Sequence, residues 1–135
     1  MSQRVLQPAG WPRPSGYSNG IAASSGTLVF VAGQIGWDAS GRLEHGDFVA
    51  QARQALRNVM SILAEAGAGA EHVVRLTWYV TDVAEYRAAA VPLGVAYREI
   101  MGKHYPAMTA VQVAALLEPG ALVEIEATAV VGSRL

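Results

Sequence analysis

Apolar and polar residues recur along the chain with two different periods, and the shorter period predicts strands. Four segments are continuously apolar or alternate residue by residue, as buried and half-buried strands do. They are TLVFVAGQI (27–35), HVVRLTWYV (72–80), AMTAVQVAAL (107–116) and ALVEIEATAVV (121–131). The turn residues Glu118-Pro119-Gly120 separate the last two. The pattern therefore predicts four strands.

The longer period predicts a helix from about Asp47 to Ala66. Apolar side chains recur in this segment every three or four residues, so that they share one face of a helix. They are Phe48, Ala52, Leu56, Val59, Met60 and Leu63. Asp47 can cap the start of this helix and Gly67 can end it.

A second helix is predicted from Asp82 to about Met101. Asp82 is followed three residues later by Glu85, which is the spacing of a capping box, and Gly102 can end the helix. Pro92 lies inside this segment and lacks the N–H group of a helical residue. We therefore expect Pro92 to kink or split the helix.

The remaining segments have turn chemistry and no clear period. The chain begins with MSQRVLQPAGWPRP, which is polar and rich in proline, and continues with the turn-rich PSGYSNGIAASSG. The segment WDASGRLEHG (37–46) is predicted to be a loop. Because the chain has no internal repeat and no linker, residues 1–135 are expected to form a single domain.

The predicted order of elements indicates an α+β fold, with two main helices on one face of a mixed sheet. One layer of helices leaves the other face of the sheet uncovered. One set of alternate residues in the last strand must therefore face the helices, and the other must face water or another subunit. The two sets are Val123, Ile125 and Ala127, and Glu124, Glu126 and Thr128.

The composition favours an oligomer and excludes several kinds of site. Hydrophobic residues make up 52% of the chain and charged residues 16%, so we expect part of the apolar surface to be buried between subunits. The net charge is -1 and the cations are scattered, which leaves no basic stripe for a nucleic acid. The absence of cysteine excludes disulfides, thiol catalysis and thiolate metal sites.

The sequence also bears on location and bound groups. No apolar run approaches the ~18 residues of a membrane span, and the polar start of the chain does not read as a signal peptide. We therefore expect a cytoplasmic protein with no membrane partner. His45, His72 and His104 lack the spacing of a metal site, and neither a metal nor a cofactor is expected.

Six motifs follow one another in a specific order. They are SGYSNG, VAGQIGWD, AQARQALRNVMSILAEAG, VVRLTWYVTDVAEY, YPAMTAVQVAAL and VEIEATAVV. With these motifs the chain, from about Ser15 to Val131, resembles the Rid superfamily (YjgF/YER057c/UK114), whose best-known members are RidA-like enamine/imine deaminases. The resemblance implies a chorismate-mutase-like α+β fold. It also implies a homotrimer whose sheets form a central barrel, with small-molecule clefts at the subunit interfaces.

The resemblance further implies roles for individual residues. Tyr17 corresponds to a tyrosine of the family's pocket, and Glu124 to the glutamate that positions or activates the water attacking an imine carbon. The residues expected to bind the substrate are Tyr17, Ala32, Gly33, Met108, Thr109 and Ala110. Without the resemblance, Glu124 is a polar residue on a half-wet strand face and Tyr17 is a packing tyrosine.

Three positions depart from the family's pattern. Ala32 stands where a small polar residue is usual, Ala110 where cysteine is frequent, and Met108 where an arginine grips the substrate carboxylate. Losing a bidentate Arg–carboxylate contact in a desolvated cleft costs a few kcal/mol of binding. Methionine offers an adaptable apolar wall instead. The chain is therefore expected to be a divergent member and not a standard 2-imino acid deaminase.

The predicted cleft suits a neutral, larger or aromatic ligand, or a ligand whose charge is bound by another group. Arg98 and Lys103 of the second predicted helix are candidates for that group, and solvated surface positions are the alternative. Trp37 and Trp78 are candidates to stack on a ligand, with core or interface packing as the alternative. His104 is a candidate for proton transfer near the mouth of the cleft.

Three functions are open for such a cleft. The first is a hydrolase or deaminase acting on an imine, an enamine or a related metabolite, with Glu124 handling the water. The second is a non-catalytic trimer that binds a small metabolite or regulates another process. The family's older labels, translation inhibitor and endoribonuclease, suggest a third function, but the near-neutral charge argues against binding RNA.

Overall fold

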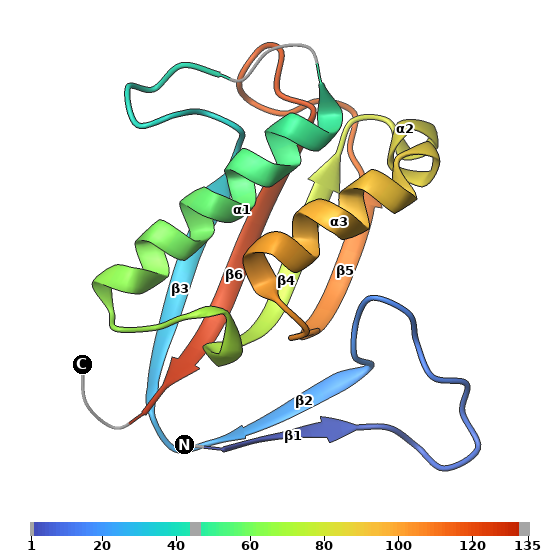
Figure 1. Cartoon of the computed structure of the whole chain (residues 1–135), viewed down its shortest axis with the longest axis vertical. Helices are drawn as coiled ribbons and strands as arrows, with labels where there is room; N and C mark the ends of the chain where they lie inside the picture. Colours follow the sequence, from blue (N-terminus) through green and yellow to red (C-terminus); the bar gives the residue numbers. More distant parts are fainter. Residues whose placement is uncertain (1, 44–46, 133–135) are drawn as a thin grey trace.

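A four-stranded mixed sheet forms the centre of the protein (Figure 1). The structure is a computed structural model that describes residues 2–43 and 47–132, so His45 and the end of the predicted loop 37–46 lie outside the described residues. The strands are β3 (Thr27–Gln34), β4 (Val73–Val80), β5 (Ala107–Gln112) and β6 (Val123–Val131), in the spatial order β3-β6-β4-β5. β4 and β5 are parallel, and the other neighbouring strands are antiparallel. The four predicted strands are confirmed.

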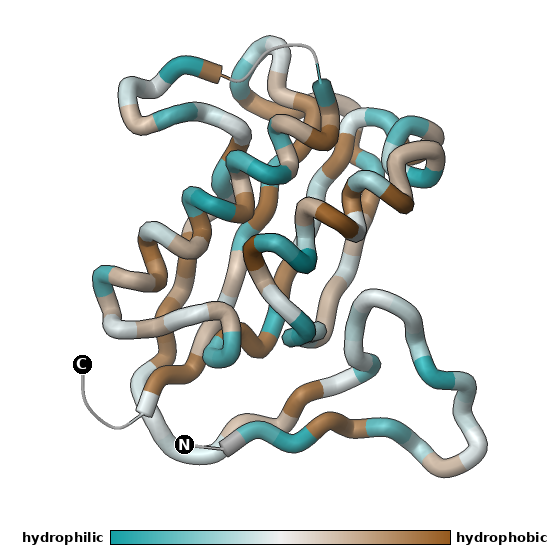
Figure 2. The backbone as a smooth tube through the Cα atoms, in the orientation of Figure 1, coloured by the Kyte–Doolittle hydropathy of each residue, from teal (hydrophilic) through white to brown (hydrophobic). Residues whose placement is uncertain are grey.

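The helices lie on one face of this sheet, as the predicted α+β layout requires (Figure 1). The first helix, α1 (Phe48–Glu65), begins after Asp47, whose Oδ1 accepts a hydrogen bond from the N–H of Val49 at 3.0 Å. Gly67 follows the end of α1 with a φ of 69°, in the left-handed region that favours glycine. A short 3-10 helix, η1 (Ala70–His72), then leads into β4. Figure 2 shows hydrophilic and hydrophobic residues alternating along α1, as expected for a helix with one buried face.

The second predicted helix is divided into α2 (Val83–Ala88) and α3 (Ala90–Met101). The expected split is confirmed, but it lies at Ala89, three residues before the proline. Pro92 therefore occupies the first turn of α3, where its missing N–H group would have no helical partner in any case. No helix in the described part of the chain is long and apolar enough to cross a membrane.

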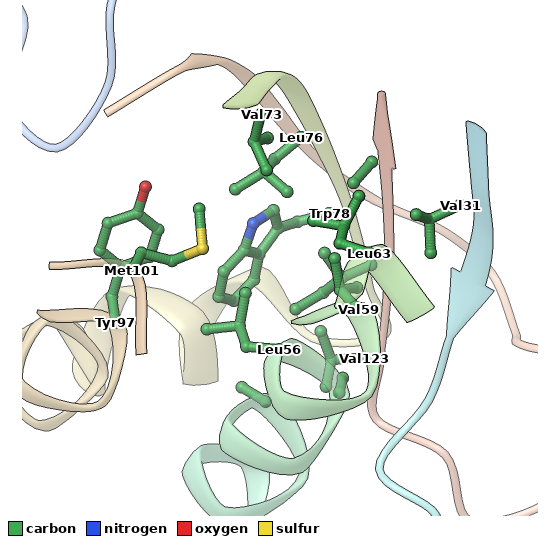
Figure 3. Packing of buried hydrophobic residues seen from close by; sticks show 14 of the residues in the cluster. Val31, Leu56, Val59, Leu63, Val73, Leu76, Trp78, Tyr97, Met101 and Val123 are labelled. Carbon is green, nitrogen blue, oxygen red and sulfur yellow. The ribbon is translucent and has the colours of Figure 1, made fainter. Parts of the chain in front are cut away.

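The alternation along β6 decides between the two arrangements that the sequence left open. The set that faces the helices is apolar and at most 4% exposed: Val123, Ile125 and Ala127. The set on the opposite side is half-buried: Glu124, Glu126 and Thr128. Figure 3 shows Leu56, Val59 and Leu63 of α1 in the core, together with Leu76 and Trp78 of β4. The core therefore lies between the sheet and the helices.

The face of the sheet that points away from the helices, which we call the open side, exposes large apolar residues. Phe30 is 72% exposed, Leu28 59% and Val111 43%. Phe30 is paired with Thr128 of β6, which places it on the same side as the two glutamates. Apolar residues that are exposed on both edge strands of one sheet face, beside half-buried polar groups, are typical of an interaction surface.

An N-terminal hairpin forms a separate two-stranded sheet, and here the prediction of turns and loops alone was wrong. β1 (Ser2–Leu6) pairs antiparallel with β2 (Gly20–Ser24). Val5 and Leu6 are 55% and 39% exposed, so the hairpin has little of the buried face whose alternation reveals a strand. The loop 7–19 joins the two strands and extends toward the start of β5 (Figure 1).

β5 ends at Gln112, four residues before the end of the predicted strand 107–116. The N–H of Val113 still donates to the carbonyl of Val80 at 2.8 Å, after which the chain leaves the sheet. Leu117, in the loop that follows, is 99% exposed. Apolar composition alone does not distinguish such an exposed loop from a strand, which explains the overlong prediction.

Candidate ligand-binding site

The predicted site residues of one chain fall on opposite sides of the sheet. Glu124 lies on the open side, together with the exposed Ala32 and Thr109. Met108 and Ala110 are in register with buried residues of β4, and Met108 packs against the core from the helix side. A single chain therefore does not bring Glu124 and Met108 into one pocket.

Glu124 is held against a glycine of the neighbouring strand. Gly33 lies so close that a Cβ atom at this position would collide with the carboxylate of Glu124. The register of β3 against β6 shifts between Val31 and Gln34, so Gly33 lies in an irregular stretch of β3. Within residues 2–43 and 47–132, no side chain or N–H group donates a hydrogen bond to the Glu124 carboxylate. This carboxylate is therefore available to a water or a ligand.

The second glutamate of the strand, Glu126, has a partner. The hydroxyl of Tyr79 on β4 donates to Glu126 Oε1 at 2.5 Å. This hydrogen bond raises the pKa of Tyr79, and partial burial and the charges of Glu126 and Glu124 raise it further. Tyr79 is therefore protonated at neutral pH. Of the two carboxylates, Glu126 accepts a hydrogen bond from Tyr79, whereas Glu124 accepts none from the residues that the structure describes.

A cavity of about 340 Å³ lies on the helix side of the sheet, between β4, β5, the two helices α2 and α3, and the N-terminal loop. Met108 lines this cavity, and its thioether side chain presents an apolar, adaptable surface. The described residues that line it include no aspartate or glutamate. They are Ser15, Gly16, Trp78, Tyr86, Ala90, Leu93, Gly94, Tyr97, Arg98, Tyr105 and Met108.

Aromatic rings form much of the cavity wall. Tyr97 and Tyr105 stack with their ring centroids 5.4 Å apart, and Trp78 meets Tyr86 edge to face at 6.2 Å. The hydroxyl of Tyr97 donates to the carbonyl of His104 at 2.6 Å. Burial raises the pKa values of Tyr86 and Tyr97, so both phenols are neutral at physiological pH. The wall therefore favours a flat apolar or aromatic ligand body.

Two nitrogen groups of the cavity lining, on Trp78 and Arg98, have no hydrogen-bond or ion-pair partner in the described part of the chain. Trp78 is 2% exposed, and its indole Nε1–H is buried without an acceptor, which costs about 1–3 kcal/mol. In Figure 3 this nitrogen is on the side of the indole that faces Tyr97 and Met101. The guanidinium of Arg98 forms no ion pair there, and it lies over Gly94, where a Cβ atom would be 3.3 Å from Nη1. Both groups are hydrogen-bond donors.

The N-terminal loop closes one end of the cavity. The Ser18 hydroxyl donates to the carbonyl of Tyr105 at 2.5 Å, and the Ser18 N–H donates to the carbonyl of Pro106 at 3.0 Å. These bonds bring Ser15 and Gly16 to the cavity wall. Tyr17, between them and Ser18, is 37% exposed and does not line the cavity.

Three other candidates lie away from the cavity lining. Lys103 is exposed, and Trp37 is 40% exposed in the loop after β3. The Nε2 atom of His104 lies 2.6 Å from the carbonyl of Val73, so this ring nitrogen is already engaged. In the two described ranges, no group of three or more His, Asp or Glu side chains is placed to hold a metal ion.

Sequence reasoning missed most residues of the cavity lining, among them the aromatic Tyr86 and Tyr105. They come from α2 and from the turn before β5, and no spacing along the chain links them. The only available signal was their aromatic type beside recognised motifs, because it is the packing of α2 and α3 on the sheet that brings them together. Arg98 and Trp78, in contrast, had been named as candidates from the sequence.

Comparison with known proteins identifies the family. Residues 12–131 match the family model described as Endoribonuclease L-PSP. The 2-iminobutanoate/2-iminopropanoate deaminase of Capra hircus is 36% identical, over 96% of this chain and 91% of that protein. Protein DfrA of Myxococcus xanthus is 33% identical, over 96% of this chain and 97% of that protein.

Solved structures agree with this result. A protein of unknown function of the conserved Rid protein family from Yersinia pestis superposes with a TM-score of 0.83 at 36% identity, covering 97% of this chain and 100% of that one. RidA from an Antarctic Psychrobacter superposes with a TM-score of 0.69 at 32% identity, covering 95% of this chain and 99% of that one. The chain therefore belongs to the Rid (YjgF/YER057c/UK114) superfamily.

Proposed function

We propose that the protein is a cytoplasmic homotrimer that binds a small molecule in clefts between its subunits and hydrolyses a C=N bond there. Relatives named 2-iminobutanoate/2-iminopropanoate deaminase support this reaction type. The observation that carries the proposal is the free, half-buried carboxylate of Glu124, held against Gly33 while Tyr79 engages Glu126. A carboxylate in such a position can act as a general base.

The open side of the sheet supports the trimer. Phe30, Leu28 and Val111 expose apolar surface that a second copy of the chain would remove from water. Glu124 and Met108 of one chain lie on opposite sides of its sheet. If the open side of one chain contacts the helix-side edge of the next, Glu124 of the first chain and Met108 of the second come to one cleft. In this proposal each cleft needs two chains.

The proposed reaction consumes one water. The Glu124 carboxylate takes a proton from the water as its oxygen bonds to the imine carbon. This proton passes to the nitrogen as the C=N bond becomes single, which gives a carbinolamine. The hydroxyl proton of the carbinolamine then passes through Glu124 to the nitrogen while the C–N bond breaks, so that ammonia leaves and the carbonyl forms. Tyr79 stays neutral beside Glu124 and holds the second carboxylate, which keeps Glu126 from competing for the water.

The methionine at position 108 supports a substrate other than a standard aliphatic 2-imino acid. In this proposal a thioether stands where the family's deaminases have a guanidinium, and a thioether cannot form charge-assisted bonds to a carboxylate. The same substitution supports a second candidate function, a non-catalytic trimer that binds a small metabolite.

Ammonia release from imino acids tests the proposal. An amino-acid oxidase generates the imino acid of alanine or 2-aminobutanoate in the assay mixture. The protein is present in molar excess over the oxidase. We expect no acceleration by the wild-type protein, measurable turnover by Met108→Arg, and none by Met108→Leu, the matched control. Adding Glu124→Gln to Met108→Arg should abolish the turnover. If Met108→Arg is trimeric and inert, the hydrolase is contradicted and the binding trimer is favoured.

A further inference from the structure

A buried amide side chain joins helix α1 to the turn before the strand that carries Glu124. Among the residues that the structure describes, Gln51 is the only polar or charged residue that is buried, at 1% exposure. Its Nε2 group donates to the carbonyl of Gly120 at 3.0 Å, and its Oε1 atom accepts from the N–H of Leu122 at 2.8 Å. One side chain thus bonds two peptide groups of the turn 120–122, as a donor to one and an acceptor from the other.

The turn that Gln51 holds lies directly before Glu124. Leu122 is followed by Val123, the first residue of β6, and Glu124 is the second residue of that strand. The carbonyl of Leu122 accepts from the N–H of Thr81 at 3.1 Å, so both polar backbone groups of Leu122 are bonded. The side chain of Val123 is completely buried. The backbone that leads into Glu124 is therefore fixed by α1 and by the residue that follows β4.

The backbone of Gln51 also meets the segment that follows β3. A Cβ atom at Gly36 would lie 2.7 Å from the Cα atom of Gln51, so the chain at Gly36 passes directly against the helix. Gly36 comes three residues after Gly33, which has no side chain where the carboxylate of Glu124 lies. The register of β3 against β6 shifts in the stretch that contains Gly33, so the ladder is irregular at this point. Gln51 therefore contacts the chain close to each partner of the Gly33–Glu124 contact.

We propose that Gln51 is a positioning residue that holds the Glu124 carboxylate against Gly33. It acts through the turn 120–122 and not by contact with a substrate. The inference rests on the proposed function for the reaction that Glu124 performs, but the position of the carboxylate can be measured without that reaction. A general base must lie within hydrogen-bond reach of the water that it activates, and a displacement of about 1 Å can cost about 100-fold in rate.

Two substitutions of Gln51 and one control separate positioning from general stability. Gln51→Met keeps the length of the side chain and removes both hydrogen bonds. In Gln51→Glu the neutral carboxylic acid can donate to Gly120 and accept from Leu122 as the amide does, whereas the ionised carboxylate cannot donate. Because burial favours the neutral form, Gln51→Glu should keep both bonds near about pH 5 and lose the bond to Gly120 as the pH rises toward about 9. Gln54→Met is the matched control, since Gln54 donates to Asn58 at 2.9 Å within the same helix.

The measurement is the nuclear Overhauser effect between the Hα protons of Gly33 and the Hγ protons of Glu124. A Cβ atom at Gly33 would lie 2.8 Å from the Cγ atom of Glu124, so these protons are close in the wild type. The cross-peak is assigned through its loss in Glu124→Ala. We expect it at equal intensity in the wild type and in Gln54→Met, and several-fold weaker in Gln51→Met. In Gln51→Glu it should match the wild type at the low pH and weaken as the pH rises, within the range in which circular dichroism shows that the variant is folded.

Turnover gives a second readout, in the Met108→Arg background of the imino-acid experiment. Adding Gln51→Met should lower kcat about tenfold or more and leave KM nearly unchanged, because the base is displaced while the residues that bind the substrate are not. Adding Gln54→Met should change neither constant. A residue that only stabilises the fold would lower the unfolding midpoint of Gln51→Met without changing the cross-peak or kcat.

Three results would overturn the inference. They are the absence of the cross-peak in the wild type, an unchanged cross-peak in folded Gln51→Met, and an equal weakening in Gln54→Met. If Gln51→Met does not fold, Gln51→Glu decides, and a cross-peak that stays constant as the pH rises contradicts the positioning role. If Met108→Arg is inert, the proposed hydrolase fails, and the cross-peak still decides the role of Gln51.

Discussion

The two faces of the sheet differ in what one chain provides for them. On the helix side, Leu76 and Ile125 are completely buried by α1 and α3, and the cavity beside them is walled by aromatic rings. On the open side, Phe30 is 72% exposed and lies on the same face as the half-buried Glu124. The helix side is a packed core with a cavity beside it, whereas the open side carries exposed apolar residues and a Glu124 carboxylate that accepts no hydrogen bond from the described residues. The comparison indicates that a single chain completes the burial of its helix side and leaves its open side exposed, which is the side that our proposal covers with a second copy of the chain.

The largest expected effect comes from placing a charge on the open side. Phe30→Asp should prevent assembly, because burying an unpaired carboxylate between subunits costs several kcal/mol per ion. Sedimentation velocity should show the mass of one chain, 14.2 kDa, with the far-ultraviolet circular dichroism of the wild type. Val91→Asp is the control, since Val91 is 79% exposed on α3 and Asp suits the start of a helix. An assembled Phe30→Asp would show that the open side is not the interface.

Substitutions on the helix side should lower the free energy of unfolding without preventing assembly. Leu76→Ala removes a fully buried side chain of β4 and should lower the free energy of unfolding by about 2–5 kcal/mol. The measurement is denaturant unfolding of this variant in the Phe30→Asp background, so that assembly does not contribute. Leu117→Ala, at a position 99% exposed, should change it by less than about 0.5 kcal/mol. A cost below about 1 kcal/mol for Leu76→Ala would contradict the assignment of the core.

A smaller effect is expected where β3 meets β6, the strand that carries both glutamates. Gly33→Ala should destabilise the protein by about 1–3 kcal/mol, because its new Cβ atom collides with the carboxylate of Glu124. Glu124→Ala in the same chain should recover most of this loss, as measured by a double-mutant cycle in denaturant unfolding. Additive effects of the two substitutions would show that Gly33 and Glu124 are not in contact.

The smallest effect concerns the hydrogen bond from Tyr79 to Glu126. The pKa of Tyr79 is raised in the folded protein, so its contribution to stability is complete below the unfolded value of 10.0 and is lost as the pH rises through the folded value. The denaturant midpoint of the wild type should therefore fall as the pH rises above about 10, and the midpoint of Tyr79→Phe should fall less steeply over the same range. Tyr17→Phe, at an exposed tyrosine, serves as the control. An identical alkaline decline in wild type and Tyr79→Phe would contradict the assignment.

The sequence predicted those parts of the fold in which burial is periodic. Val123, Ile125 and Ala127 alternate with polar residues because one face of β6 meets the helices, and this pattern revealed the strand. The hairpin of β1 and β2 was missed because Val5 and Leu6 are largely exposed, so the two strands show no comparable alternation.

The candidate site was predictable only in part. Motif order pointed to Glu124 and Met108, but not to their location on opposite faces, which depends on strand register. Arg98 was one of several cations on a helix until packing placed it at a cavity, and the missing acceptor of Trp78 is a property of the folded core. Register and tertiary packing carry this information, and neither is contained in a local pattern.

Interchain cross-linking tests the central claim, that each cleft combines the Glu124 side of one chain with the Met108 side of another. The chain contains no cysteine, so Ala32→Cys and Ala110→Cys each introduce a single thiol, at exposed positions beside Gly33 and near Met108. The two variants are mixed, reassembled, treated with a short bis-maleimide and digested for mass spectrometry. We predict a cross-linked peptide pair joining residues 32 and 110 of different chains. An assembled mixture that yields no such pair would contradict the claim.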